Sequence, residues 1–123
     1  MKYLLDSNII IYHLNNDLIA TNFIMKFYSE SSISVITYYE ILAYGYNFHD
    51  FNSVEKFLKI FKIIDIDLNI VRLAIQNLKV KKVKIADNLI TATAQINNLT
   101  LVTRNVVDFK GLGVNILNIY ENN

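Results

Sequence analysis

Short apolar runs alternate along the chain with segments whose apolar residues recur at helical spacing. The runs that predict buried strands cover residues 2–5, 32–36, 63–66, 99–103 and 114–117. The segments that predict helices cover 8–14, 17–29, a stretch opening at Thr37, a stretch opening near Asn52, 68–79 and 85–97. This alternation predicts an α/β fold, with a mostly parallel central sheet of about five strands flanked by helices on both faces.

The same pattern predicts which helical faces are buried. In the helix over 17–29 the apolar face is formed by Ile19, Phe23, Ile24 and Phe27. In the helix over 68–79 it is formed by Leu68, Val71, Ala74, Ile75 and Leu78. Asn52 and Glu55 have the spacing of a capping pair, which indicates a helix start at Asn52.

Composition indicates one folded domain over residues 1–123. With 53% hydrophobic residues and a mean hydropathy of +0.28, the chain is well outside the disordered class, and no apolar run is long enough to span a bilayer. Asp6, Ser7 and Asn8 interrupt the first apolar run too early for an export signal. The chain has no cysteine, which excludes thiolate chemistry and agrees with a cytoplasmic protein.

Four acidic residues stand where apolar runs end or begin: Asp6, Glu40, Asp87 and Asp108. In a parallel sheet, ligands bind at the carboxyl ends of the strands, and three of these acids follow strands in the predicted order. Each acid also has a structural interpretation. Asp6 could cap a helix, Glu40 could form a capping box with Thr37, Asp87 could complement a helix dipole, and Asp108 could stabilise a turn.

Convergence of these acids on one sheet edge would require a cation. Two carboxylates about 4 Å apart repel by roughly 4 kcal/mol at an effective dielectric constant near 20. Oxygen ligands select a hard ion such as Mg²⁺ or Mn²⁺. His13 and His49 are isolated, and we interpret both as structural or surface residues.

Basic residues border the acidic ones, although the net charge is only +1. Four lysines precede Asp87, and Arg104 and Lys110 flank Asp108; the lysines are Lys79, Lys81, Lys82 and Lys84. A lysine-rich loop can simply be a solvated surface. Beside a metal site it can instead receive a polyanion. In that interpretation the candidate contacts to the backbone of the polyanion are Lys81, Lys82, Lys84 and Arg104.

Four sequence motifs occur in order along nearly the full length. They are Leu-Leu-Asp-Ser-Asn-Ile at 4–9, a Ser-x-x-Thr-x-x-Glu pattern at 34–40, Ile-Ala-Asp-Asn-Leu-Ile-Thr-Ala-Thr-Ala at 85–94, and Leu-Val-Thr-Arg-Asn-Val-Val-Asp-Phe at 101–109. With these motifs the chain resembles the PIN-domain family, and within it the VapC-like ribonuclease toxins of type II toxin–antitoxin modules.

The resemblance implies a role for each matching residue. Asp6 is expected to be the central metal ligand, with Asp87 and Asp108 completing a divalent-ion site directly or through water. Glu40 is expected to orient or coordinate at the rim of that site. The implied reaction is hydrolysis of RNA phosphodiester bonds by a metal-activated water. The implied ion is Mg²⁺, with Mn²⁺ as the alternative. The polar supports in the family motifs correspond to Asn8, Thr103 and Asn105, whose alternative roles are caps and turns.

The resemblance also implies a cognate antitoxin that covers the active-site groove, and a homodimer that forms a larger complex with it. Aromatic residues suited to an interface gather on and after one predicted helix, at Tyr38, Tyr39, Tyr44, Tyr46 and Phe48. Their other interpretation is ordinary core or surface.

Two functions of other kinds compete with the nuclease. The first is a PIN-like module that binds RNA or protein without cutting, which the four intact acids disfavour. The second is a phosphatase of another doubly wound fold with Asp6 as nucleophile. Such enzymes generally need a second aspartate two positions later, where this chain has Asn8.

Overall fold

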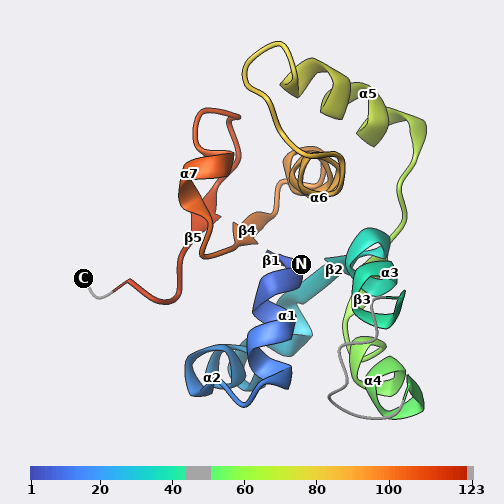
Figure 1. Ribbon diagram of the computed structural model, residues 1–123, viewed down its shortest axis with the longest axis vertical. Coiled ribbons are helices and arrows are strands. Elements are labelled where there is room, and N and C mark those ends of the chain that lie inside the picture. The colour runs from blue at the N-terminus through green and yellow to red at the C-terminus, as the bar shows by residue number, and fades with distance from the viewer. Residues whose placement is uncertain (44–50, 122–123) are drawn as a thin grey trace.

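A computed structural model describes residues 1–43 and 51–121. Over these residues the sheet has five parallel strands in the order β3-β2-β1-β4-β5, so that β1 is central (Figure 1). The strands are β1 (Tyr3–Leu5), β2 (Ser31–Ser34), β3 (Lys62–Ile64), β4 (Thr100–Val102) and β5 (Ile116–Leu117). The predicted α/β fold with a parallel sheet is confirmed.

Helices cover both faces of this sheet. They are α1 (Ser7–Leu14), α2 (Leu18–Phe27), the 3-10 turn η1 (Tyr28–Glu30), α3 (Val35–Ala43), α4 (Phe51–Leu58), α5 (Leu68–Asn77), α6 (Ile85–Ile96) and α7 (Val106–Phe109). In Figure 1, α1 and α2 lie on one side of the strands and α6 on the other, with α5 outside α6. None of the helices among the described residues is long and apolar enough to cross a membrane.

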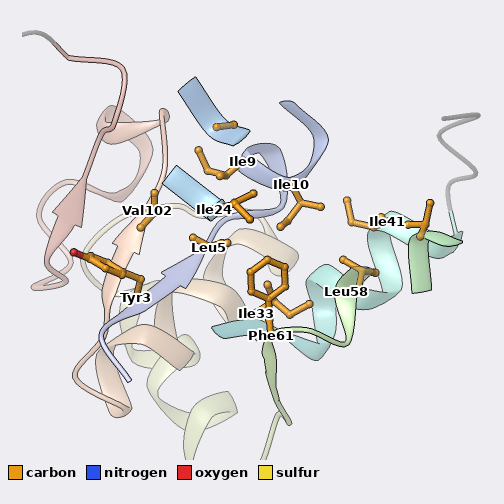
Figure 2. Packing of buried hydrophobic residues seen from close by; sticks show 12 residues of the cluster. Tyr3, Leu5, Ile9, Ile10, Ile24, Ile33, Ile41, Leu58, Phe61 and Val102 are labelled. Atoms are coloured by element: carbon orange, nitrogen blue, oxygen red, sulfur yellow. The ribbon is translucent and has the colours of Figure 1, made fainter. Parts of the chain in front are cut away.

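Alternation along β1 divides the core between the two faces. Leu5 packs with Ile9, Ile10 and Ile24 of α1 and α2 (Figure 2), whereas Leu4 packs with Ile90 of α6. Successive side chains of a strand point to opposite faces, so a strand that is apolar at every position must be buried on both. Both faces of β1 are therefore covered by helices, and the first polar residue after this strand is Asp6.

The starts of α3 and α4 differ from the prediction. Helix α3 begins at Val35, and the Ser34 hydroxyl accepts a hydrogen bond from the Ile36 amide at 3.0 Å, so Thr37 lies inside the helix. Helix α4 begins at Phe51, so Asn52 is not its cap.

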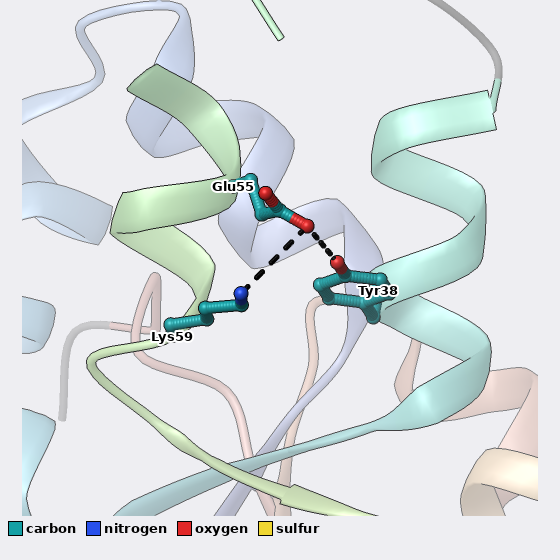
Figure 3. Close-up of polar contacts among 3 residues, drawn as sticks. All are labelled: Tyr38, Glu55 and Lys59. Carbon is teal, nitrogen blue, oxygen red and sulfur yellow. Dashed lines mark hydrogen bonds and ion pairs between the residues drawn. The ribbon is translucent and has the colours of Figure 1, made fainter. Parts of the chain in front are cut away.

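The acid of the supposed Asn52 capping pair has other partners. The Glu55 carboxylate accepts a hydrogen bond from the Tyr38 hydroxyl and lies 3.9 Å from the Lys59 amine (Figure 3). Glu55 therefore links α4 to α3, and its side chain does not cap the start of its own helix.

The predicted buried face of α5 is right only in part. Ala74 is buried and Val71 is half-buried as predicted, but Leu68, Ile75 and Leu78 are exposed. The helix also buries Ile70 and Asn77. The pattern of apolar residues does not predict that Asn77 is buried, because its burial depends on hydrogen bonds from its side-chain amide to the side chains of Asn88 and Gln95 on α6. A buried polar group is stable only when its hydrogen bonds are made, and here α6 makes them.

Smaller differences concern α2 and the last loop. Ile19 of α2 is 48% exposed, and Ala20 takes the buried position next to it. Helix α7 was not predicted, because four residues are too few to show helical periodicity. Gly111 and Gly113 have φ values of +93° and +74°, which glycine adopts readily, and they turn the chain from α7 into β5.

Candidate active site

Asp6 follows the central strand and is 4% exposed. Its amide donates to the Val102 carbonyl at 3.0 Å, which extends the pairing of β1 with β4 by one residue. The Thr103 hydroxyl, which directly follows β4, donates to Asp6 Oδ2 at 2.8 Å. Asp6 precedes α1, but its side chain makes no capping hydrogen bond. The fold therefore holds this carboxylate at the sheet edge for something other than helix capping.

Glu40 reaches the same edge from α3. Its Oε1 accepts a hydrogen bond at 2.7 Å from the hydroxyl of Ser7, the residue next to Asp6. The Ser7 hydroxyl also lies 2.9 Å from the hydroxyl of Thr37, one turn before Glu40. The capping box between Thr37 and Glu40 is thus excluded, because both side chains face Ser7.

Asp87 and Asp108 form the other part of the site. Asp87 is in the first turn of α6, and Asp108 is in α7. Both line a cavity of about 160 Å³ together with Lys82, Val83 and Lys84. The Asp108 carboxylate accepts a hydrogen bond from the Asn105 side-chain amide at 2.6 Å.

Burial and mutual repulsion raise the pKa values of two of these acids. Burial is the main cause that raises the pKa of Asp6 to about 6; Asp87 and Glu40 add repulsion, whereas the Thr103 hydroxyl opposes the shift. Burial also raises the pKa of Asp87, with further repulsion from Asp108 and a partial offset from Lys84. The four acids therefore form a series of electrostatic neighbours in the order Glu40, Asp6, Asp87 and Asp108.

The donor set fits a hard divalent ion. All donors are carboxylate oxygens, and within the described residues no basic side chain forms an ion pair with any of the four acids. Over residues 1–43 and 51–121 no three Asp, Glu or His side chains are close enough to hold one ion together. Mg²⁺ is commonly held by one or two carboxylates plus water, so the neighbouring pairs suffice. The ligand set of Asp6, Asp87 and Asp108 stays a prediction.

Comparison with known families agrees with this arrangement. The family model described as PIN domain matches residues 3–113. The chain belongs to the PIN-domain family. Proteins of this family are generally nucleases and generally use divalent metals. The resemblance inferred from the four motifs is confirmed at this level. No curated protein matches the sequence.

Solved structures similar to this PIN domain are toxin–antitoxin complexes. A chain of a toxin-antitoxin complex from Klebsiella pneumoniae has 30% identity and a TM-score of 0.86, with 98% of this chain and 99% of that chain covered. DNA-bound VapBC from Salmonella typhimurium has 25% identity and a TM-score of 0.82, with coverage of 97% and 98%. VapBC2 from Rickettsia felis bound to a promoter DNA fragment has 27% identity and a TM-score of 0.77, with coverage of 96% and 98%.

The PIN domain brings together two of the three predicted polar supports. Thr103 donates to Asp6, and its hydroxyl accepts from the Asn105 amide at 3.0 Å, so that Asn105 links Asp6 to Asp108. Asn8 is exposed on the first turn of α1 and makes no side-chain hydrogen bond within the described residues.

The predicted basic contacts divide into two kinds. Lys82 and Lys84 are exposed and line the cavity with Asp87 and Asp108. Lys81 instead donates to two backbone carbonyls, and the Arg104 guanidinium lies over the rings of Tyr120 at 4.5 Å and Tyr12 at 5.8 Å. Contact of all four with RNA stays a prediction.

Sequence reasoning missed Ser7 and Thr37 as groups that position Glu40. The available signal was that Ser7 directly follows Asp6. His13 is structural, as expected: its ring stacks on Phe57 at 4.7 Å, its Nδ1 lies 2.7 Å from the Thr21 hydroxyl, and burial lowers its pKa. His49 and the aromatic residues Tyr44, Tyr46 and Phe48 lie outside the described residues.

Proposed function

We propose that this protein is a divalent-metal-dependent endoribonuclease that acts as the toxin of a toxin–antitoxin pair. The observation that carries the proposal is the environment of Asp6. Its carboxylate is nearly fully buried, has acids on both sides, and has no basic side chain paired with it among the described residues. Such an arrangement is unfavourable for an isolated protein and favourable once a cation binds.

Asp6, Asp87 and Asp108 would hold the ion either directly or through bound water, because no three acids among the described residues are close enough to ligate one ion directly. Mg²⁺ or Mn²⁺ fits these oxygen donors. When bound, the ion supplies a nucleophilic water at neutral pH and stabilises the charge that develops on the phosphate. Thr103 orients Asp6 through a 2.8 Å hydrogen bond. Ser7 orients Glu40 at the rim through one of 2.7 Å.

An RNA substrate is supported by the lysines beside the acids. Lys82 and Lys84 line the same cavity as Asp87 and Asp108, so a phosphate at the cavity would meet positive charge beside the acids. Lysine ammonium groups bind phosphates as point charges, and the affinity that these contacts contribute falls as the salt concentration rises. This arrangement favours a polyanionic substrate that the carboxylates alone would repel.

An antitoxin partner is supported by the similar structures, which are toxin–antitoxin complexes. We propose that the antitoxin covers the active-site groove, that the toxin forms a homodimer, and that both assemble into a larger complex. The exposed side chain of Tyr39 is 61% accessible and suits such an interface. The place of action would be the cytoplasm, where RNA substrates are found.

The direct test is cleavage of structured RNA by the purified protein. We expect cleavage with Mg²⁺ or Mn²⁺, loss with EDTA, recovery when the ion is restored, and loss in Asp6→Asn and Asp87→Asn. A matched DNA substrate tests whether cleavage is specific to RNA. Cleavage that survives both substitutions would indicate a different site or a contaminating nuclease.

Expression in cells tests the toxin part of the proposal. We expect growth arrest by the wild type and not by Asp6→Asn at equal protein level. Equal toxicity of the two would exclude catalysis as the cause. Tight binding of RNA by the wild type without cleavage under any divalent ion would favour the non-catalytic PIN-like module.

A further inference from the structure

Lys81 contacts the protein's own backbone at the end of α7. Its amine donates to the Val107 carbonyl at 2.9 Å and to the Lys110 carbonyl at 3.1 Å. Both carbonyls belong to the last turn of α7 and the residue after it, where a helix leaves carbonyls without intrahelical partners. A lysine at this position satisfies two of them with one charged donor.

This contact joins the two segments that supply Asp87 and Asp108. Lys81 lies in the loop that leads through Lys82 and Lys84 into the first turn of α6, where Asp87 is. Val107 and Lys110 flank Asp108 in sequence. The two acids line one cavity, so the separation of these segments sets the separation of the carboxylates.

Helix α7 needs such a contact because it has few others. It has four residues, far below the length at which a helix is stable alone, and Asp108 and Val107 are exposed. On its inner side, Phe109 is buried, and the Gln95 side-chain amide donates to the Leu112 carbonyl. On the side of the lysine loop, the described hydrogen bonds to this segment come from Lys81.

We propose that Lys81 is a positioning residue, which holds Asp108 beside Asp87 by binding the carbonyls at the end of α7, and that it is not a contact for RNA. The proposal rests on the proposed function, because it assigns Lys81 a part in building the same metal site. The proposal also distinguishes the lysines of one loop by role. Lys82 and Lys84 line the cavity, whereas the ammonium of Lys81 already donates to two backbone carbonyls.

The test compares Lys81→Met with Lys79→Met, which removes the same charge from an exposed position of the same loop. In Lys81→Met we expect faster backbone hydrogen exchange over residues 106–112 and about 10-fold weaker Mn²⁺ binding by calorimetry, as for groups that orient metal ligands. In Lys79→Met both measurements should match the wild type. Lys81→Arg keeps charged donors and should recover most of both properties.

Kinetics give a second criterion. We expect Lys81→Met to lower kcat and raise the Mn²⁺ concentration needed for half activity, with the KM for RNA changed no more than in Lys79→Met. A raised KM with unchanged hydrogen exchange and unchanged Mn²⁺ binding would overturn the proposal and make Lys81 an RNA contact.

The two proposals can fail separately. If the wild type neither binds Mn²⁺ nor cleaves RNA, the proposed function fails, while hydrogen exchange over 106–112 still decides whether Lys81 holds α7. If the wild type is active and exchange in Lys81→Met is unchanged, only the positioning role fails. Circular dichroism and thermal unfolding of each variant exclude global loss of the fold as the cause.

Discussion

The carboxylates of Glu55 and Asp6 have opposite surroundings. Glu55 on α4 is half-buried and has two partners, the Tyr38 hydroxyl and the Lys59 amine (Figure 3). Asp6 is more deeply buried and has the Thr103 hydroxyl as a partner, while its charged neighbours are acids. Glu55 stabilises the contact between two helices, whereas Asp6 costs stability until a cation binds. A buried acid without a compensating charge indicates function more strongly than the presence of an acid alone.

Replacing Asp6 should have the largest effect on activity. Asp6→Asn keeps the shape and an acceptor for Thr103 but removes the charge that holds the ion, and metal assistance accounts for several kcal/mol of transition-state stabilisation. We expect kcat/KM for RNA to fall by about 10³-fold. Thermal unfolding without divalent ions should show Asp6→Asn to be more stable than the wild type. The matched control is Glu55→Gln, which should lower stability and leave activity nearly unchanged.

Removing the Thr103 hydroxyl should have the second largest effect. Thr103→Val keeps the buried volume but removes the donor to Asp6 and the acceptor for the Asn105 amide. Loss of a group that orients a metal ligand costs about 10- to 100-fold in activity or affinity. The effect is measured as kcat/KM and as Mn²⁺ affinity. Wild-type values for both would contradict the orienting role of Thr103.

The pH dependence of stability should show the cost of the buried Asp6. Its pKa rises from 3.8 in the unfolded chain to about 6 in the fold, so the folded state binds the proton more tightly. Stability is therefore highest below the unfolded pKa and is lost as pH rises through 6. Without divalent ions, lowering the pH from 7 to 5 should increase the Asp6 contribution to unfolding free energy by about 1 kcal/mol.

The His13 pKa is lowered by burial, which opposes this trend below its unfolded pKa of 6.5. The measurement is therefore the difference between denaturant unfolding curves of the wild type and Asp6→Asn across this range. A difference that does not shrink as pH falls would contradict an ionised, uncompensated Asp6. Saturating Mg²⁺ should reduce the pH dependence of the wild type.

Substitutions of the two partners of Glu55 should have the smallest effects. Tyr38→Phe removes the hydroxyl donor to Glu55, and we expect a fall in Tm of roughly 2 to 4 °C with no change in Mn²⁺ binding. Lys59→Met removes the 3.9 Å ion pair, in which the lysine is largely exposed, so its effect on Tm should be smaller still. Wild-type Mn²⁺ affinity in both variants would confirm that the surroundings of Glu55, unlike those of Asp6, take no part in metal binding. Weaker Mn²⁺ binding in either variant would contradict that difference.

Sequence predicted the central part of the site because the covalent order of the chain determines it. The apolar run that ends at Asp6 is buried on both faces, and a parallel order brings the next strand ends to the same edge. The positions of Asp6 and Thr103 follow from that order. The position of Asp108 does not follow from it, because Asp108 lies on a four-residue helix too short to predict. Lys81 contacts the end of that helix, and Gln95 contacts the segment after it.

Hydrogen-bond partners account for the other differences. Thr37 and Glu40 have the spacing of a capping box, but both side chains instead contact Ser7 at the start of α1. Asn77 is not part of the predicted apolar face of its helix, yet it is buried because its side-chain amide donates to the side chains of Asn88 and Gln95. Lys81 resembles its neighbouring lysines in sequence, and only the carbonyls of α7 distinguish it. In each case the deciding partner is far away in the chain.

The central claim is that the Asp6 carboxylate is held in place to bind a divalent cation. The most direct measurement is Mn²⁺ titration by calorimetry of the wild type and Asp6→Asn at pH 6 in two buffers of different ionisation enthalpy. The wild type should bind Mn²⁺ and release protons, because the ion displaces the proton from an acid with a pKa of about 6, whereas Asp6→Asn should bind far more weakly. Equal binding by both proteins, or no binding by the wild type, would contradict the account.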